Sequence, residues 1–142
     1  MADQDKIAQL REIHMFAALP DDALDQVAAS AADFAAPAGH VLIQPNQLGN
    51  GLLILTSGRA TVELGAQSIA CDAGECLGEL SLLVDGVHHV ARVRAATDVR
   101  GFAISRDDFD KLLGSDSRIA LALLRSLARR LVETDRLLTS DR

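Results

Sequence analysis

Residues 74 to 90, with the sequence GECLGELSLLVDGVHHV, contain the residue types best suited to binding a ligand. A glycine–glutamate pair opens a short apolar turn, and a further glycine lies at the tip of the segment. This arrangement predicts a pocket for a small anionic ligand. Such a pocket favours a fixed positive charge in its second half, where the chain instead has His88 and His89. Because histidine has an ordinary pKa of about 6.5, both side chains are expected to be mostly neutral at pH 7.

The sequence does not support a metal site or an enzyme. Cys71 and Cys76 precede the two histidines, but a C-x4-C spacing is not a zinc-finger pair and no second cysteine pair exists. We also find no recognisable Ser-His-Asp set, phosphate loop or pair of catalytic carboxylates. His14 and His40 are expected to be ordinary surface or half-buried residues. The predicted protein is a non-enzyme with no metal and no cofactor.

Length and composition restrict the possible partners. The 142 residues suffice for one domain, predicted over residues 1–142. A net charge of −6, with four Phe and no Tyr or Trp, disfavours nucleic acid and acidic membranes as partners. No apolar run approaches the roughly 20 residues of a transmembrane helix, and the N-terminus does not resemble a signal peptide. We therefore predict a cytoplasmic location.

The hydrophobic period changes twice along the chain, which predicts three regions. Residues 5–32 have helical spacing, broken at Pro20, after which Asp21 is expected to cap a second helix. Residues 33–104 contain short apolar runs separated by Gly, Asn and Pro, which predict a closed or double-sheet β architecture. Residues 105–139 return to helical spacing, with Ser105 as one N-cap and Asp116 or Ser117 as the next.

The last helix carries an apolar seam with spacings that alternate between three and four residues. Its members are Ala120, Leu124, Leu127, Leu131, Thr134 and Leu138. This alternation is typical of a helix that packs against another helix. The seam could instead pack on the β region of its own chain, but Ile119 and Leu123 on a neighbouring face could do that. We therefore predict a homodimer formed through Leu124, Leu127, Leu131 and Leu138.

In this order, the segments resemble a cyclic nucleotide-binding domain of the kind found in bacterial catabolite activators, kinase regulatory subunits and gated channels. FAALPDDALDQVAAS resembles the opening helical segment, and GECLGELSLL within residues 74–95 resembles the phosphate-binding cassette. SLARRLVETDRLL resembles the long dimerising helix of the activators. The resemblance implies an α+β, mainly β fold: an eight-stranded double-sheet β-roll, jelly-roll-like, flanked by N-terminal helices and a long C-terminal helix.

The resemblance also implies roles for particular residues. The cassette residues Gly78 and Glu79 would contact ribose and phosphate, and the turn beginning at Leu80 and Ser81 would direct free N–H groups at the anion. The phosphate-binding Arg and the adjacent Ser or Thr of the family align with His89 and Val90. Loss of a charged hydrogen bond costs about 1.5–3 kcal/mol, so binding is expected to be roughly ten- to a hundredfold weaker.

Three further positions complete this interpretation. Thr134 aligns with a threonine that hydrogen-bonds adenine in the activators. Arg92 and Arg94 are not expected to replace the missing phosphate-binding Arg. The chain ends at Arg142, where the activators continue into a helix-turn-helix, so a sensor domain without a DNA-binding module is expected.

Two main functions remain open at this stage, and a third, weaker possibility is that a different anion or a lipid-like ligand occupies the roll. The first is a cyclic-nucleotide sensor that binds cAMP or a related nucleotide and signals to an unidentified effector protein through its last helix. The second is a degenerate fold that acts as a ligand-independent protein-interaction module, which the departures at His89 and Val90 favour.

Overall fold

The computed structural model describes residues 2–44, 51–78 and 92–140, and describes the α5 side chains as far as Glu133. Two short helices come first, α1 (Ala2–Arg11) and α2 (Asp21–Ser30). The predicted helical spacing continues past Arg11, but the chain forms turns over residues 12–18 that still bury Ile13 and Phe16. Apolar spacing therefore identified the buried positions there and not the end of the helix.

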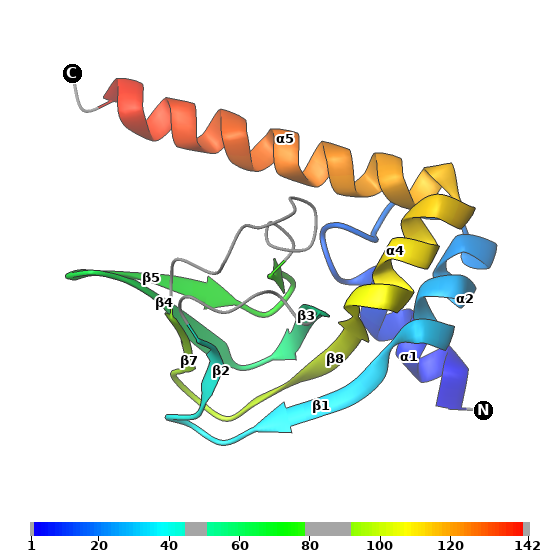
Figure 1. The fold of residues 1–142 in the computed structure, drawn as a ribbon, viewed down its shortest axis with the longest axis horizontal. Coiled ribbons are helices and arrows are strands. Elements are labelled where there is room, and N and C mark those ends of the chain that lie inside the picture. Colours follow the sequence, from blue (N-terminus) through cyan, green and yellow to red (C-terminus); the bar gives the residue numbers. More distant parts are fainter. Residues whose placement is uncertain (1, 45–50, 79–91, 141–142) are drawn as a thin grey trace.

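The predicted double sheet is confirmed, because the described strands form two four-stranded antiparallel sheets (Figure 1). The first has the order β1 (Ala32–Ala36), β8 (Val99–Ser105), β3 (Gly51–Ser57) and β6 (Cys76–Leu77). The second has the order β2 (Val41–Ile43), β7 (Arg92–Ala95), β4 (Arg59–Leu64) and β5 (Gln67–Asp72). Strands far apart in the sequence thus lie together, which closes the roll.

Two helices follow the roll, α4 (Arg106–Ser115) and α5 (Ser117–Ser140). Ser105 caps α4 as predicted, because its hydroxyl accepts a hydrogen bond from the N–H of Asp108 at 3.2 Å. The prediction for α2 was wrong: Pro20 holds the N-cap position and makes no side-chain cap, while the Asp21 carboxylate pairs with Arg11. No helix in the described ranges is long and apolar enough to cross a membrane.

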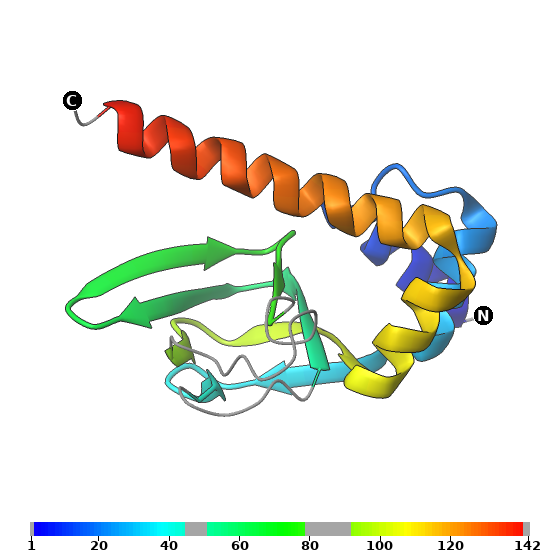
Figure 2. The same ribbon diagram turned by 45° about the horizontal axis from the view of Figure 1, so that its top comes forward.

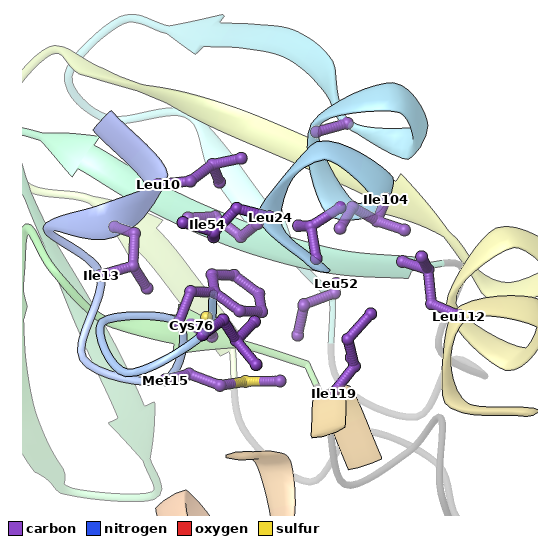
Figure 3. Packing of buried hydrophobic residues seen from close by; sticks show 14 of the residues in the cluster. Leu10, Ile13, Met15, Leu24, Leu52, Ile54, Cys76, Ile104, Leu112 and Ile119 are labelled. Atoms are coloured by element: carbon purple, nitrogen blue, oxygen red, sulfur yellow. The ribbon is translucent and has the colours of Figure 1, made fainter. Parts of the chain in front are cut away.

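The core has two parts, one between the helices and the first sheet and one inside the roll. The larger part joins Leu10, Leu24 and Leu112 to the strand residues Leu52 and Ile54 (Figure 3). The smaller part lies between the two sheets and comprises Ala36, Ile43, Leu55, Ala60, Val93, Ala95 and Val99. At roughly 25 cal/mol for each Å² of buried apolar area, these clusters supply the main stabilisation of the fold.

The first residues of α5 are fixed by both apolar packing and an ion network. Ile119 and Leu123 are buried in the larger cluster, as predicted for the face of the helix that meets its own body. Arg118 donates to Asp22 of α2 at 2.8 and 3.1 Å and to Asp116 at 2.7 and 3.0 Å. Asp116 also accepts from the N–H of Arg118, so it caps α5, and from Gln26.

Glycine is required in β8 because the neighbouring strand approaches closely. A Cβ at Gly101 would collide with the carbonyl oxygen of Ile54 and lie 2.9 Å from its carbonyl carbon. We expect Gly101→Ala to lower the free energy of unfolding by about 1–3 kcal/mol, since the two strands would have to separate. Gly114 in α4 has open space around it, so Gly114→Ala is expected to raise stability by about 0.5–1 kcal/mol. Urea denaturation measures both, and equal effects would contradict this account.

The ion network predicts a pH-dependent stability. Hydrogen bonding from Arg118 is the largest cause that lowers the pKa of Asp116 from 3.8 to about 2, and it also lowers the pKa of Asp22. A carboxyl with a lowered pKa in the folded state stabilises above its ordinary value and loses that contribution as the pH falls toward 2. The stability difference between wild type and Arg118→Gln should therefore be largest above pH 4 and shrink toward pH 2. Denaturation at several pH values tests this, and a constant difference would refute it.

Candidate functional site

A cavity of about 700 Å³ lies between α5 and the β4–β5 hairpin, and both ribbon views show α5 running past the hairpin on one side of the roll (Figures 1 and 2). This volume is within the range of about 300–1,000 Å³ found for small-molecule sites. Its walls come from four parts of the chain. The lining residues are His14, Val62, Ile69, Ala70, Cys71, Asp72, Glu75, Leu77, Arg129, Arg130 and Glu133.

The turn between β5 and β6 contains the first residues of the predicted cassette and contributes Glu75 to the wall of this cavity. The N–H of Gly74 donates to Leu55 O at 2.8 Å, and the N–H of Leu55 donates to Glu75 O at 3.0 Å, so the turn is fastened to β3. Gly74 and Gly78 both have positive φ, +102° and +93°, a conformation that glycine adopts without strain. The close approach of a ligand to the backbone of Gly78 stays a prediction.

Arg130 connects α5 to this turn. Its Nη2 donates to the carbonyl oxygen of Cys76 at 2.9 Å and lies 3.5 Å from Oε2 of Glu75. The other carboxylate oxygen of Glu75 lies 3.8 Å from Nε2 of His14, and the N–H of His14 donates to Gly74 O at 3.1 Å. Glu75 thus lies between the N-terminal segment and α5, directly before β6 begins.

The helix also brings charges to the cavity that are not hydrogen-bonded or ion-paired to other described residues. Arg129 and Glu133 lie four residues apart on α5, are exposed, and have no hydrogen bond or ion pair within the described part of the chain. A guanidinium and a carboxylate can each bind a ligand group of opposite charge or suitable hydrogen-bonding capacity. The cavity can therefore accommodate a ligand with both an anionic and a donor-bearing part.

The structure describes only some of the predicted site residues. Gly78 directly follows the lining residue Leu77, and the backbone of Thr134 directly follows the lining residue Glu133. The Thr134 side chain lies outside the described residues, and so do Glu79, Leu80, Ser81, His89 and Val90. Their roles remain predictions.

Sequence reasoning did not identify the residues that α5 and the N-terminal segment contribute. His14 was expected to have no special role, and Arg129, Arg130, Glu75 and Glu133 were not singled out. A helical-wheel alignment with Leu123 would have indicated that Arg130 lies on the inner face of α5. Its hydrogen-bond acceptor, Cys76 O, is 54 residues away in the sequence, so the pairing could not be predicted. Arg94 donates to Gly39 O at 3.1 Å and to Glu63 at 3.3 Å, so its guanidinium is already bound within the roll.

The apolar side chains exposed on α5 differ from the predicted seam. Leu124 and Leu131 are 63% and 64% exposed, whereas Leu127 packs partly against the core. Leu121 and Val132 are exposed beside them at 43% and 48%. The exposed stripe is therefore rotated around the helix from the predicted one, because the inner face follows Ile119, Leu123 and Leu127. Leu138 lies beyond the described side chains.

The sequence model of the cyclic nucleotide-binding domain matches residues 34–116, which is more than half of the chain. The chain belongs to this family. The match covers the roll and α4, including the segment that contains Gly78. The family resemblance inferred from the cassette residues is thereby confirmed.

Individual relatives agree with this assignment. A cyclic nucleotide-gated potassium channel of Rhizobium etli is 27% identical over 118 residues, which are 83% of this chain and 33% of the relative. The chain therefore spans about a third of that relative's length. The catabolite activator protein of Thermus thermophilus is 29% identical with a TM-score of 0.76, over 88% of this chain and 61% of the other.

A third relative shares the fold at lower identity. The regulatory domain of Toxoplasma gondii PKA, solved with cAMP, is 19% identical with a TM-score of 0.75. The match covers 89% of this chain and 50% of that one. This chain thus has the fold of regulatory cyclic nucleotide-binding domains.

The contact between Arg130 and the turn predicts how α5 is held. Arg130→Met removes the hydrogen bond to Cys76 O and should cost about 1 kcal/mol of local stability, because the arginine is partly solvated. Amide exchange in the second half of α5 should then be about fivefold faster. Arg125→Met, one turn earlier, is the matched control and should change little. Similar exchange in both variants would show that Arg130 does not hold the helix.

Proposed function

We propose that this chain is a cytoplasmic, non-catalytic sensor domain that binds cAMP or a related cyclic nucleotide. The observation that carries the proposal is the cavity between α5 and the roll, at the end of the turn that leads into the family cassette. The family membership supports the ligand class, and the positive φ of Gly78 supports the expected close approach of backbone to ligand.

The ligand would contact both the roll and the last helix. The phosphate would lie against Gly78, Glu79, Leu80 and Ser81, with His89 as a pH-dependent partner and the Val90 N–H nearby. The base would extend toward α5, where Thr134 follows Glu133. Arg129 would add positive charge at the helix side of the cavity, which partly offsets the missing arginine of the cassette.

Signalling would proceed through α5, because this helix is a wall of the cavity. Ile119, Leu123 and Arg118 fix its first turns, whereas Arg130 links a later turn to the roll. A ligand that binds more tightly to one position of the helix would shift the population toward that position. The exposed Leu124 and Leu131 support a homodimer formed through this helix, with an effector protein reading the change.

A ligand-independent interaction module is the second candidate. The exposed apolar stripe of α5 favours it, since that stripe could bind a partner whether or not the cavity is filled. In that case Leu124→Asp would abolish partner binding in pull-downs, and Glu79→Ala would leave it unchanged. A sensor would show nucleotide-dependent pull-down that Glu79→Ala removes.

Calorimetry with cAMP, cGMP and cyclic di-GMP tests the sensor directly. We expect binding that is tighter at pH 6 than at pH 8, since protonated His89 can pair with a phosphate. His89→Arg should tighten binding about ten- to a hundredfold and remove most of the pH dependence. His40→Arg, on the exposed turn before β2, is the control and should have no effect. No heat from any of the three nucleotides up to millimolar concentration would refute the proposal.

A further inference from the structure

A second groove, of about 480 Å³, lies beside the N-terminal segment. It is formed by the connection between α1 and α2 and by the first half of α5, which lie side by side in both ribbon views (Figures 1 and 2). The lining residues are His14, Met15, Ala18, Leu19, Pro20, Arg118, Leu121, Ala122, Arg125, Ser126 and Arg129. Only His14 and Arg129 among these also line the cavity.

The floor of the groove is apolar. Met15 and Leu19 belong to the larger core cluster and are 7% and 4% exposed, so they form a fixed surface. Leu121 rises from α5 beside them and is 43% exposed. An exposed leucine next to a rigid apolar floor is suited to receive an apolar side chain from outside.

The rim of the groove is basic. Arg125 and Arg129 are exposed, lie one turn apart, and have no ion pair with the described residues. Arg118 is already paired with Asp22 and Asp116, so it contributes little net charge. None of the described residues that line the groove is acidic, although the whole chain has a net charge of −6.

We propose that this groove docks an acidic, amphipathic segment of a partner protein. Eleven residues separate Arg118 from Arg129, which corresponds to about 16 Å along the helix, or three turns. One apolar side chain of the segment would contact Leu121 and Leu19, and carboxylates on its flank would pair with Arg125 and Arg129. This inference rests on the proposed function, since it names the chemistry of the effector that contacts α5.

A second copy of the chain suits a different face. The exposed Leu124 and Leu131 do not line the groove, although Leu121 beside them does. A small-molecule ligand is also disfavoured, because such sites have several polar groups that converge on one point. Here the polar groups lie along the rim.

The test uses two fluorescein-labelled synthetic helices of 16 residues. One has Leu on one face and Glu on the other, and its counterpart has Lys in place of every Glu. Fluorescence anisotropy should show binding of the Glu peptide that is at least tenfold tighter than that of the Lys peptide and weaker at high salt. Arg125→Glu and Leu121→Ala should each weaken it about five- to tenfold. The control Arg100→Glu, on β8, should not.

Several results would overturn the proposal. These are equal binding of both peptides, no binding at millimolar peptide, or equal losses in the groove variants and the control. If light scattering shows that Arg125→Glu changes the mass of the protein, the occupant is a second copy and the proposal is wrong. Nucleotide calorimetry on the same variants separates this test from the previous one, because Arg125 and Leu121 do not line the cavity.

Discussion

The cavity and the groove both depend on how α5 is attached to the rest of the molecule. Ile119 and Leu123 are buried in the core, and the Arg118 guanidinium joins Asp22 to Asp116, so the first turns of the helix have a fixed direction. Because of this direction, the later turns of α5 lie over the β4–β5 hairpin. No strand or helix of the described chain covers the face of α5 that points away from the hairpin (Figure 1). The cavity, the groove and the exposed stripe are all formed in part by α5. A change in its angle would alter all three together.

The site combines a rigid part with a part held by few contacts. The turn from Gly74 to Gly78 is fastened to β3 by backbone hydrogen bonds. The later part of α5 is linked to that turn by Arg130, whose side chain is 36% exposed. Solvated contacts of this kind contribute on the order of 1 kcal/mol, which is small enough for a ligand to compensate. The architecture of the site thus permits a helix movement without unfolding the roll.

The sequence predicted the roll well where residues alternate or where glycine and asparagine mark corners. It did not identify β1, because Ala-rich ADFAA has weak strand propensity and gains its place from pairing with β8. It also did not identify β6, whose two residues are too short for a pattern. The inner face of α5 was predicted at Ile119 and Leu123, but the ion pair of Glu75 with Arg130 spans 55 residues and requires the fold. The family cassette was recognised from its glycines and glutamate, and those positions mostly lie outside the described residues.

His14 and Arg129 line both the cavity and the groove. A guanidinium has a single positive charge, so an anion that approaches from one side reduces the attraction felt on the other. The two occupants would therefore influence each other equally in both directions, as any pair of linked equilibria must. This coupling would require no chain of contacts through the protein, because the Arg129 side chain lines both sites.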